Sequence, residues 1–404
     1  MRDVGLKLMK QAAATTIAVC LLALPAGAQT LRDAVEGAWR LNPEVKSLEA
    51  RRAVATAQRG AGTSLVPAAP AVTLRHTTDY LSRNVGRREY EAELGVPLWL
   101  PGQGTATIRA ADALLARTDA EIAARQLAVA GEVRTAMWQV ALAERRAELA
   151  RQRLKVARQL ESDTRRTSAA GETSEADLQL ARAEALAVAA DVRDEELALE
   201  DARQAFRTLT GMGPPKAAPE PDIGNPPLDR HPSLLAAQLG VRAAQAQRQL
   251  VDLTTRDNPE VGLMARRERD VRGERYDTVM GMSVRIPFSV EAVNAPKRAE
   301  AMTEVVRSEA EQANAARTIE AEIRRARLAY QTATERQSIA RDRAAALRAR
   351  LSNVERARRG GEISLVEFVR AQETAFEADL ARATAEVQVG AARARLNQSL
   401  GVLP

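Results

Sequence analysis

The chain alternates between two hydrophobic periodicities, and each predicts a different kind of secondary structure. Between residues 71 and 98, apolar and polar side chains alternate with a period of two, which is typical of strands. One side of the second strand carries Tyr90, Ala92, Leu94, Val96 and Leu98, and the other carries Glu89, Glu91, Glu93 and Gly95. Residues 260–288 repeat the pattern, although arginines crowd the strand that begins at Glu260. We therefore expect two pairs of strands, four in all.

The length of these strands is about ten residues, which is the length that a tilted strand needs to cross a bilayer. Four strands with one apolar face cannot close a barrel alone, and an open sheet edge is not tolerated in lipid. On the strands alone, a small periplasmic sheet is therefore the alternative.

Most of the remaining chain has the composition and pattern of long helices. Two helical hairpins are predicted, over about 104–210 and about 294–400, and each outgoing helix of some 67 residues would be roughly 100 Å long. The return pieces 173–210 and 232–256 together match the outgoing helix of the first hairpin. Each hairpin is broken once by glycine, in "AGETSEADLQLARA" from Ala170 and in "GGEISLVEFVRAQE" from Gly360.

The two halves of the chain are copies of one unit. Gly171 and Gly361 are 361 − 171 = 190 residues apart, and Pro97 and Pro287 have the same separation. The order of strands and helices is also the same in both halves. We therefore expect a first repeat over residues 29–210, a Pro/Gly-rich linker over 211–229 and a second repeat over 230–404.

The N-terminus has the pattern of a secretory signal peptide, which we place at residues 1–28. A basic start is followed by an apolar run, and Ala26-Gly27-Ala28 is a small-x-small cleavage site. The run is shorter than the roughly 20 residues of a membrane-spanning helix. Cys20, the one cysteine, is an alternative lipidation site, but Val19 precedes it where such signals prefer a small residue.

Composition excludes several classes of function. Without Cys20 the mature chain has no thiolate, and His76 and His231 are isolated, so neither a metal site nor a cofactor is expected. The formal charge of +6 arises from finely mixed acidic and basic residues, and aromatics are only 3%. Nucleic-acid binding would need clustered basic residues with aromatics. No nucleophile–base or phosphate-binding motif is present, so we expect no enzymatic activity.

The signal peptide, tandem halves, strand pairs and two glycine breaks together resemble the TolC-type outer-membrane factor family over essentially the whole mature chain. The resemblance implies a mainly α fold with a small β part: long α-helical hairpins, plus four strands per protomer in a trimeric 12-strand barrel in the outer membrane. It implies a long periplasmic extension and a homotrimer in contact with outer-membrane lipid. The short chain and the "GEIS" motif most resemble those of the CzcC-like heavy-metal branch.

The resemblance also assigns a role to the two glycine breaks, which would be the periplasmic tips of the hairpins. Glycine permits the tight reversal, and Thr173, Ser174 and Ser364 are candidate helix caps. In the family the tips contact the periplasmic adaptor. Carried over to this sequence, that contact falls on Gly171, Glu172, Thr173, Gly361, Glu362 and Ile363. The family often has an apolar residue after the glycine, whereas both copies here have glutamate. Turn chemistry alone is the alternative role.

The family's closed entrance is held by bonds between neighbouring hairpins and is lined by acids. Six residues after each glycine lie Asp177 and Glu367, and Glu367 matches a pore-lining acid. The next acidic position of the family is Arg370 here, which argues against a double acidic ring. We expect Asp177 to pair with Arg358 or Arg359 of the adjoining hairpin, and solvated helix-face charge is the alternative.

The function that follows is passive export through the outer-membrane channel of a tripartite efflux system. An inner-membrane pump, of the resistance-nodulation-division type, and a periplasmic adaptor would hand over the substrate, with heavy-metal cations as one candidate class. The alternatives are a conduit for type I protein secretion or for drugs, a periplasmic adaptor, and a structural coiled-coil protein. The sequence does not name the substrate.

Overall fold

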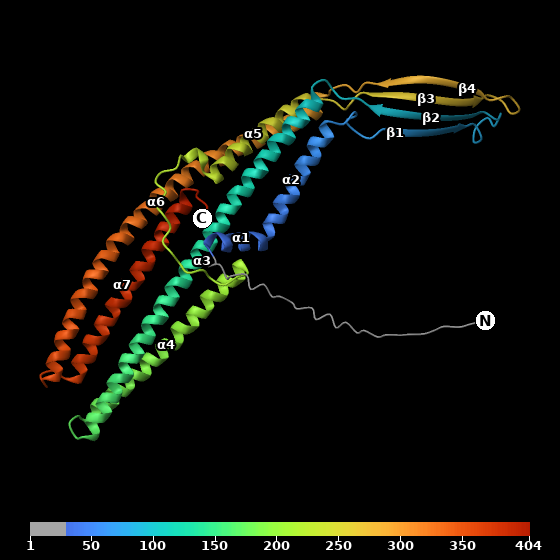
Figure 1. Cartoon of the computed structure of the whole chain (residues 1–404). Coiled ribbons are helices and arrows are strands. Elements are labelled where there is room, and N and C mark those ends of the chain that lie inside the picture. Colours follow the sequence, from blue (N-terminus) through green and yellow to red (C-terminus); the bar gives the residue numbers. More distant parts are fainter. Residues whose placement is uncertain (1–29) are drawn as a thin grey trace, which may run out of the picture.

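The computed structural model describes residues 30–404 and consists of two long helical hairpins joined to one four-stranded sheet (Figure 1). The expectation of a mainly α fold with a small β part is confirmed. The signal peptide expected over residues 1–28, including Cys20, lies outside the described residues.

The two halves of the chain contain matching elements in the same order. The first half contains α1 (Leu31–Leu41), α2 (Pro43–Gly62), β1 (Ala71–Thr78), β2 (Arg88–Pro97), α3 (Gln103–Ala169) and α4 (Glu175–Thr210). The second half contains the 3-10 turn η1 (Leu228–Arg230), α5 (Pro232–Leu253), β3 (Glu260–Arg269), β4 (Asp277–Arg285), α6 (Glu291–Arg359) and α7 (Leu365–Ser399). The segment between α4 and η1 forms neither a helix nor a strand, in keeping with its proline content.

All four strands belong to one antiparallel sheet with the order β1-β2-β3-β4. The central pair, β2 and β3, joins the two halves of the chain, with Arg88 opposite Arg269 at one end and Pro97 opposite Glu260 at the other. Strands β1 and β4 are the two edges of the sheet.

The helices form two further layers that continue the order of the strands. Near the sheet the contacts run from α2 to α3, from α3 to α5 and from α5 to α6. Farther from the sheet they run from α4 to α3, from α3 to α7 and from α7 to α6. Helices α4 and α5 both pack along α3, as their lengths predicted. The protein is thus three successive layers of four elements, and every layer has two open edges.

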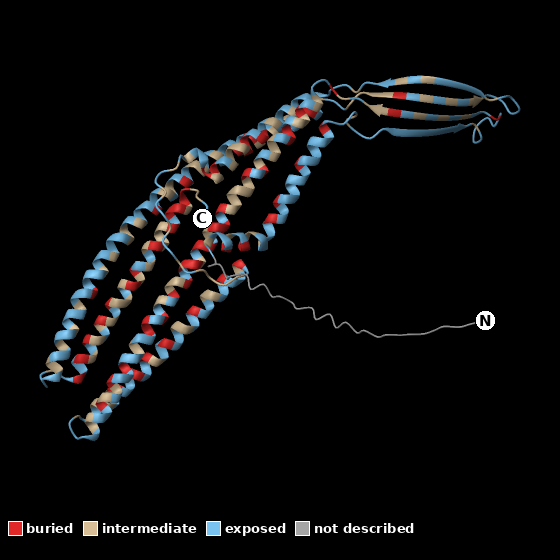
Figure 2. Cartoon of the chain, in the orientation of Figure 1, coloured by how far each residue is buried: buried red, intermediate tan, exposed pale blue. Residues whose placement is uncertain are grey.

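The largest apolar cluster lies in the middle of the molecule, where α1, α4 and α7 contact α3. The sheet, in contrast, is largely exposed (Figure 2). Trp138 of α3 and Phe206 of α4 are buried in the largest apolar cluster. Gly390 of α7 lies directly against the Trp138 ring and leaves no room for a side chain. Among residues 30–404, none of the helices contains a stretch long and apolar enough to cross a lipid bilayer.

Candidate functional site

The two hairpin turns at the ends of the long helices are built in the same way. Gly171 has φ +77° and Gly361 has φ +78°, a left-handed conformation that favours glycine. The N–H of the following glutamate donates to a carbonyl five residues back: Glu172 to Thr167 (2.9 Å) and Glu362 to Ala357 (3.0 Å). This bond pattern closes the last turn of the outgoing helix. A residue with a Cβ at either glycine would strain it.

Serine caps the returning helix in both turns. The Ser174 hydroxyl accepts a hydrogen bond from the Asp177 N–H (3.1 Å), and the Ser364 hydroxyl accepts one from the Glu367 N–H (3.3 Å). Asp177 and Glu367 therefore occupy the same position of the first helical turn, where a carboxylate interacts favourably with the helix dipole. Thr173, the other candidate cap, instead donates its hydroxyl proton to Thr167 Oγ1 (2.7 Å).

The residues expected to contact an adaptor lie at the surface of the two turns. Gly171, Glu172, Gly361 and Glu362 are exposed, and Thr173 and Ile363 are half-buried. In this kind of turn an apolar residue after the glycine commonly packs back onto the helix. Both copies have glutamate there, so each tip presents a carboxylate to solvent rather than an apolar contact.

The expected ion pair between Asp177 and an arginine of the second hairpin is absent within the described part of one protomer. The Asp177 carboxylate accepts a hydrogen bond from the Ser174 hydroxyl (2.8 Å), and Arg359 pairs with Glu355 of its own helix (2.6 Å). Arg358 lies over the Phe368 ring, 4.6 Å from its centroid. Glu367 and Arg370 are exposed.

The Arg358 guanidinium nevertheless interacts electrostatically with carboxylates of the first hairpin. Burial lowers the pKa of its guanidinium, and the nearby carboxylates of Asp177, Asp163 and Glu355 oppose that shift. Asp177 is thus close enough to act on Arg358 through space without a direct contact.

Above the tips, the two hairpins touch through a small apolar cluster that includes Leu160 and Ala181 from the first hairpin and Leu365 and Phe368 from the second. Farther along lies a cleft of about 220 Å³ between the hairpins. Arg153 reaches into it over the Phe376 ring (5.0 Å to the centroid). These contacts join residues far apart in the sequence, and no local pattern indicated them.

The sheet has one apolar and one polar face, and the apolar face is the more exposed. Strand alternation and register place Val72, Leu94, Leu263 and Met282 in one row across the apolar face. All four are exposed, and Met282 is 72% exposed. On β2 the glutamates of the opposite face are half-buried, whereas the apolar residues that alternate with them are exposed. On the two central strands the apolar side is thus the more exposed one, which is the polarity of a membrane barrel wall.

Charged residues of the polar face form pairs across the strands. Its acidic members are Glu89, Glu91, Glu93, Glu260, Glu268 and Asp277, and its basic members are Arg75, Arg266 and Arg285. Arg75 pairs with Glu91 (3.2 Å), and Arg285 pairs with Glu260 (3.5 Å). Arg266 lies 3.8 Å from Glu89. Carboxylates outnumber arginines by 6 − 3 = 3 on this face of each protomer.

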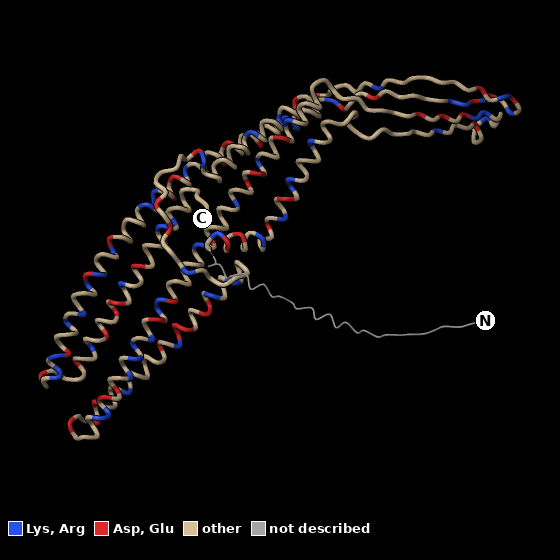
Figure 3. The backbone as a smooth tube through the Cα atoms, viewed as in Figure 1, with Lys and Arg blue, Asp and Glu red and all other residues tan. Residues whose placement is uncertain are grey.

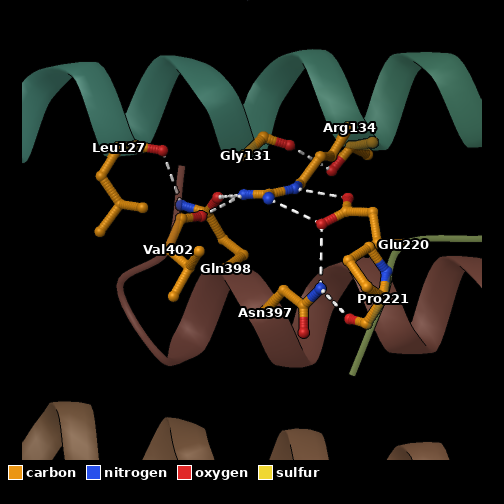
Figure 4. Close-up of polar contacts among 9 residues, drawn as sticks. Leu127, Gly131, Arg134, Glu220, Pro221, Asn397, Gln398 and Val402 are labelled. Carbon is orange, nitrogen blue, oxygen red and sulfur yellow. Dashed lines mark hydrogen bonds and ion pairs between the residues drawn. The ribbon is translucent and has the colours of Figure 1, made fainter. Parts of the chain in front are cut away.

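A buried polar network holds the linker between the two halves against the helices (Figure 4). Arg134 of α3 is only 3% exposed, and its guanidinium makes two 2.8 Å hydrogen bonds to the Glu220 carboxylate. It also donates to Gln398 Oε1 (2.7 Å) and to the Val402 carbonyl (3.0 Å). Asn397 donates to the same Glu220 carboxylate (3.0 Å). The sequence identified this segment only as a linker.

No group of three or more His, Cys, Asp or Glu side chains within residues 30–404 is arranged to hold a metal ion. The two histidines lie on different elements. His76 stacks on Tyr90 of the sheet (4.4 Å between ring centroids), and buried His231 caps α5 by accepting from the Ser233 N–H (3.2 Å). Both side chains therefore have structural contacts of their own.

Comparison with solved structures shows the fold. A membrane protein from Pseudomonas aeruginosa is 21% identical, with a TM-score of 0.74 over 92% of this chain and 93% of that chain. The outer membrane protein VceC from Vibrio cholerae is 17% identical, with a TM-score of 0.71 over 92% and 96%. The Campylobacter jejuni CmeC outer membrane channel is 16% identical, with a TM-score of 0.73 over 92% and 85%.

Comparison with sequences gives one family. No curated protein is similar enough to the chain to count as a match. The sequence model of the family described as outer membrane efflux protein matches residues 35–212 and 226–402, which is most of the chain and includes both halves. The paired helical hairpins, the sheet with its exposed apolar face and this match agree, and the chain belongs to the outer membrane efflux protein family.

Proposed function

We propose that three copies of the chain close into one channel that passively exports substrates across the outer membrane. The observation that carries this proposal is the repeated open edge: sheet and helices form layers of four elements in one order. Repeating such a layer head to tail brings each edge against the opposite edge of the next copy, and a closed ring results. Three copies supply 3 × 4 = 12 strands, an even number that suits a closed barrel.

Exposed apolar residues on the open edge support this association. Helix α6 exposes Leu328 (65%) and Ile339 (67%), which are 11 residues apart and so lie on one face of the helix. Its buried residues Ala326 and Ala344 lie on nearly the opposite face, where Ala326 packs against Leu396 of α7. Helix α4 exposes Leu186 and Leu197 at the same 11-residue spacing. A neighbouring copy would cover both stripes.

The double variant Leu328→Asp/Ile339→Asp tests the interface and the channel together. We expect the mature wild-type protein to have the mass of three chains in detergent and to give discrete currents in a planar bilayer. The double variant should remain monomeric and give none, because each copy would place two carboxylates in an apolar contact.

The matched control is Thr334→Asp/Ala345→Asp, which adds the same charge at two exposed α6 positions that are also 11 residues apart. These positions lie about 120° around the helix from the stripe. The control should remain trimeric and conducting. Wild-type protein that never conducts would refute the channel, and a trimeric Leu328→Asp/Ile339→Asp variant would refute this interface.

The polar face of the sheet would line the channel and favour cations, because three copies carry 3 × 3 = 9 more carboxylates than arginines there. Heavy-metal cations fall within the class that such a lining admits. The periplasmic tips would meet an adaptor, which connects the channel to an inner-membrane pump. The exposed Glu172 and Glu362 favour an adaptor surface with basic residues at this contact.

We further propose that Asp177 helps to hold the tips closed by pairing with Arg358 when neighbouring hairpins approach. Each pair, near the surface and only partly buried, would contribute only about 0–1 kcal/mol, but a trimer contains three such pairs. Asp177→Asn should therefore raise the open probability of the purified trimer by a few-fold in planar bilayers. The asparagine of Asp177→Asn can still accept the hydrogen bond from the Ser174 hydroxyl, so the variant tests the effect of the charge without disturbing the helix cap. Glu175→Gln, which removes the same charge from an exposed position in the same first turn of α4, is the control and should leave the open probability unchanged. An unchanged open probability for Asp177→Asn would rule out the latch.

A further inference from the structure

The apolar face of the sheet carries a basic patch at the end remote from the helices. It consists of Arg88, Arg267 and Arg269 together with Tyr90 and Tyr276, and we call it the arginine–tyrosine patch. Figure 3 shows that the charged residues of the strands gather toward this end, while the part of the sheet near the helices has few. The patch therefore borders the apolar band rather than interrupting it.

The arginines of the patch differ from those of the polar face in their partners. Arg75, Arg266 and Arg285 on the polar face each have a carboxylate within 4.0 Å. Within the described chain, none of the three patch arginines has such a partner. Arg267 and Arg269 lie over the Tyr276 ring, at 4.9 and 5.0 Å from its centroid, and Arg269 donates to the Gly86 carbonyl (3.2 Å).

The register adds a repulsion that an anion would relieve. Arg88 lies directly opposite Arg269 on the neighbouring strand, and like charges in that position are destabilising. An anion with several oxygens can bridge two guanidinium groups, since each one offers paired N–H donors. Stacking on tyrosine holds two of the guanidinium groups in place while leaving their outward N–H groups free.

The position of the patch identifies the anion. Arginine on the lipid face of a barrel is costly at the bilayer midplane but costs little near the interface. Tyrosine is enriched at the same interface, where its ring lies at headgroup level. The helices leave the sheet at its other end (Figure 1). In a channel whose helices extend into the periplasm, the patch would therefore lie at the outer edge of the membrane.

We propose that the arginine–tyrosine patch binds phosphorylated headgroups of the lipid in the outer leaflet of the outer membrane. The proposal rests on the membrane orientation under Proposed function and adds a partner to it. Each copy in a trimer would present one patch, and the bound headgroups would fix the height of the barrel in the bilayer.

The test measures lipid binding to the purified mature trimer in neutral detergent by native mass spectrometry. The probes are bis-phosphorylated lipid A and the same lipid without its phosphates. Wild-type protein should prefer the phosphorylated form by about tenfold or more, the factor that one charge-assisted hydrogen bond supplies. Arg88→Gln/Arg267→Gln/Arg269→Gln should lose that preference. An excess of inorganic phosphate should not displace the lipid.

The matched control is Arg83→Gln/Arg272→Gln/Arg275→Gln, which removes the same charge from exposed loop positions at the same end of the sheet. It should keep the preference for phosphorylated lipid. Equal loss in the control, retained preference in the patch variant or displacement by inorganic phosphate would each overturn the proposal. The patch variant should still form a conducting trimer, because its altered side chains lie outside the channel. If the proposed channel function were wrong, the wild-type protein would also fail to conduct, which distinguishes that outcome from a loss of lipid binding alone.

Discussion

Met282→Arg should abolish insertion of the protein into the outer membrane, whereas Ser283→Arg should not. The two residues are neighbours on β4, so they point to opposite faces of the sheet. Met282 is 72% exposed in the middle of the apolar face, and arginine at the bilayer midplane costs about 2–4 kcal/mol in each copy. Three copies would add this cost three times. Ser283 contacts the Glu93 carboxylate on the polar face, where a new arginine gains a partner.

Flotation with outer-membrane vesicles measures the outcome. The Ser283→Arg protein should float with the membranes as the wild type does, and the Met282→Arg protein should be lost to aggregates or degradation. The two variants carry the same added charge at adjacent residues. A difference in their insertion is therefore due to the face of the sheet that carries the arginine and not to the charge alone. Equal insertion of both variants would show that the apolar face does not contact lipid.

Glu220→Ala should destabilise the helical part of each copy by about 3–5 kcal/mol, because it leaves the buried Arg134 guanidinium without its carboxylate. The side chains of this pair are 3% and 11% exposed, so solvent contributes little to the guanidinium in place of the carboxylate. The same change also removes an acceptor from Asn397. The midpoint of helix loss in guanidinium chloride, followed by circular dichroism, measures the effect.

Asp222→Ala is the matched control, because Asp222 lies in the same linker and also pairs with an arginine. Its partner is Arg393 at 3.0 Å, but the Asp222 side chain is 68% exposed. Hydrogen bonds from the Gly224 N–H and from Arg393 hold the pKa of the Asp222 carboxyl below its usual value. We expect little change in the midpoint for this variant. If both variants unfold at the wild-type midpoint, the linker is not anchored through Glu220.

Periodicity and glycine placement predicted the strands and the two long hairpins of this fold, but not the break at Asn42 that separates α1 from α2. The period-two alternation identified the strands because each has one apolar face, and β2 begins and ends within a few residues of the expected range. Gly171 and Gly361 marked the reversals because a left-handed residue is needed there. The strand from Glu260 was the hardest to recognise, since Arg267 and Arg269 interrupt its apolar side. Their place at the edge of the apolar band explains that interruption.

The contacts between distant segments could not be predicted in the same way. Arg134 and Glu220 are 86 residues apart, and an arginine on a charged, arginine-rich helix gives no sign that it is buried. Asp177 was expected to pair with Arg358 or Arg359, but the Arg358 guanidinium stacks on the Phe368 ring and Arg359 pairs with Glu355. Which side chains meet across two helices depends on how the helices pack against each other. A sequence pattern indicates only which face of each helix is apolar.

An electron cryomicroscopy map of the mature protein in lipid nanodiscs tests most directly whether the four-stranded sheet is one third of a membrane barrel. We predict three copies, with β4 of each paired to β1 of the next, Met282 facing lipid and Glu93 facing the channel. A single copy in the particle, or a sheet that lies outside the bilayer with its apolar face covered by another part of the protein, would contradict this structure of the channel.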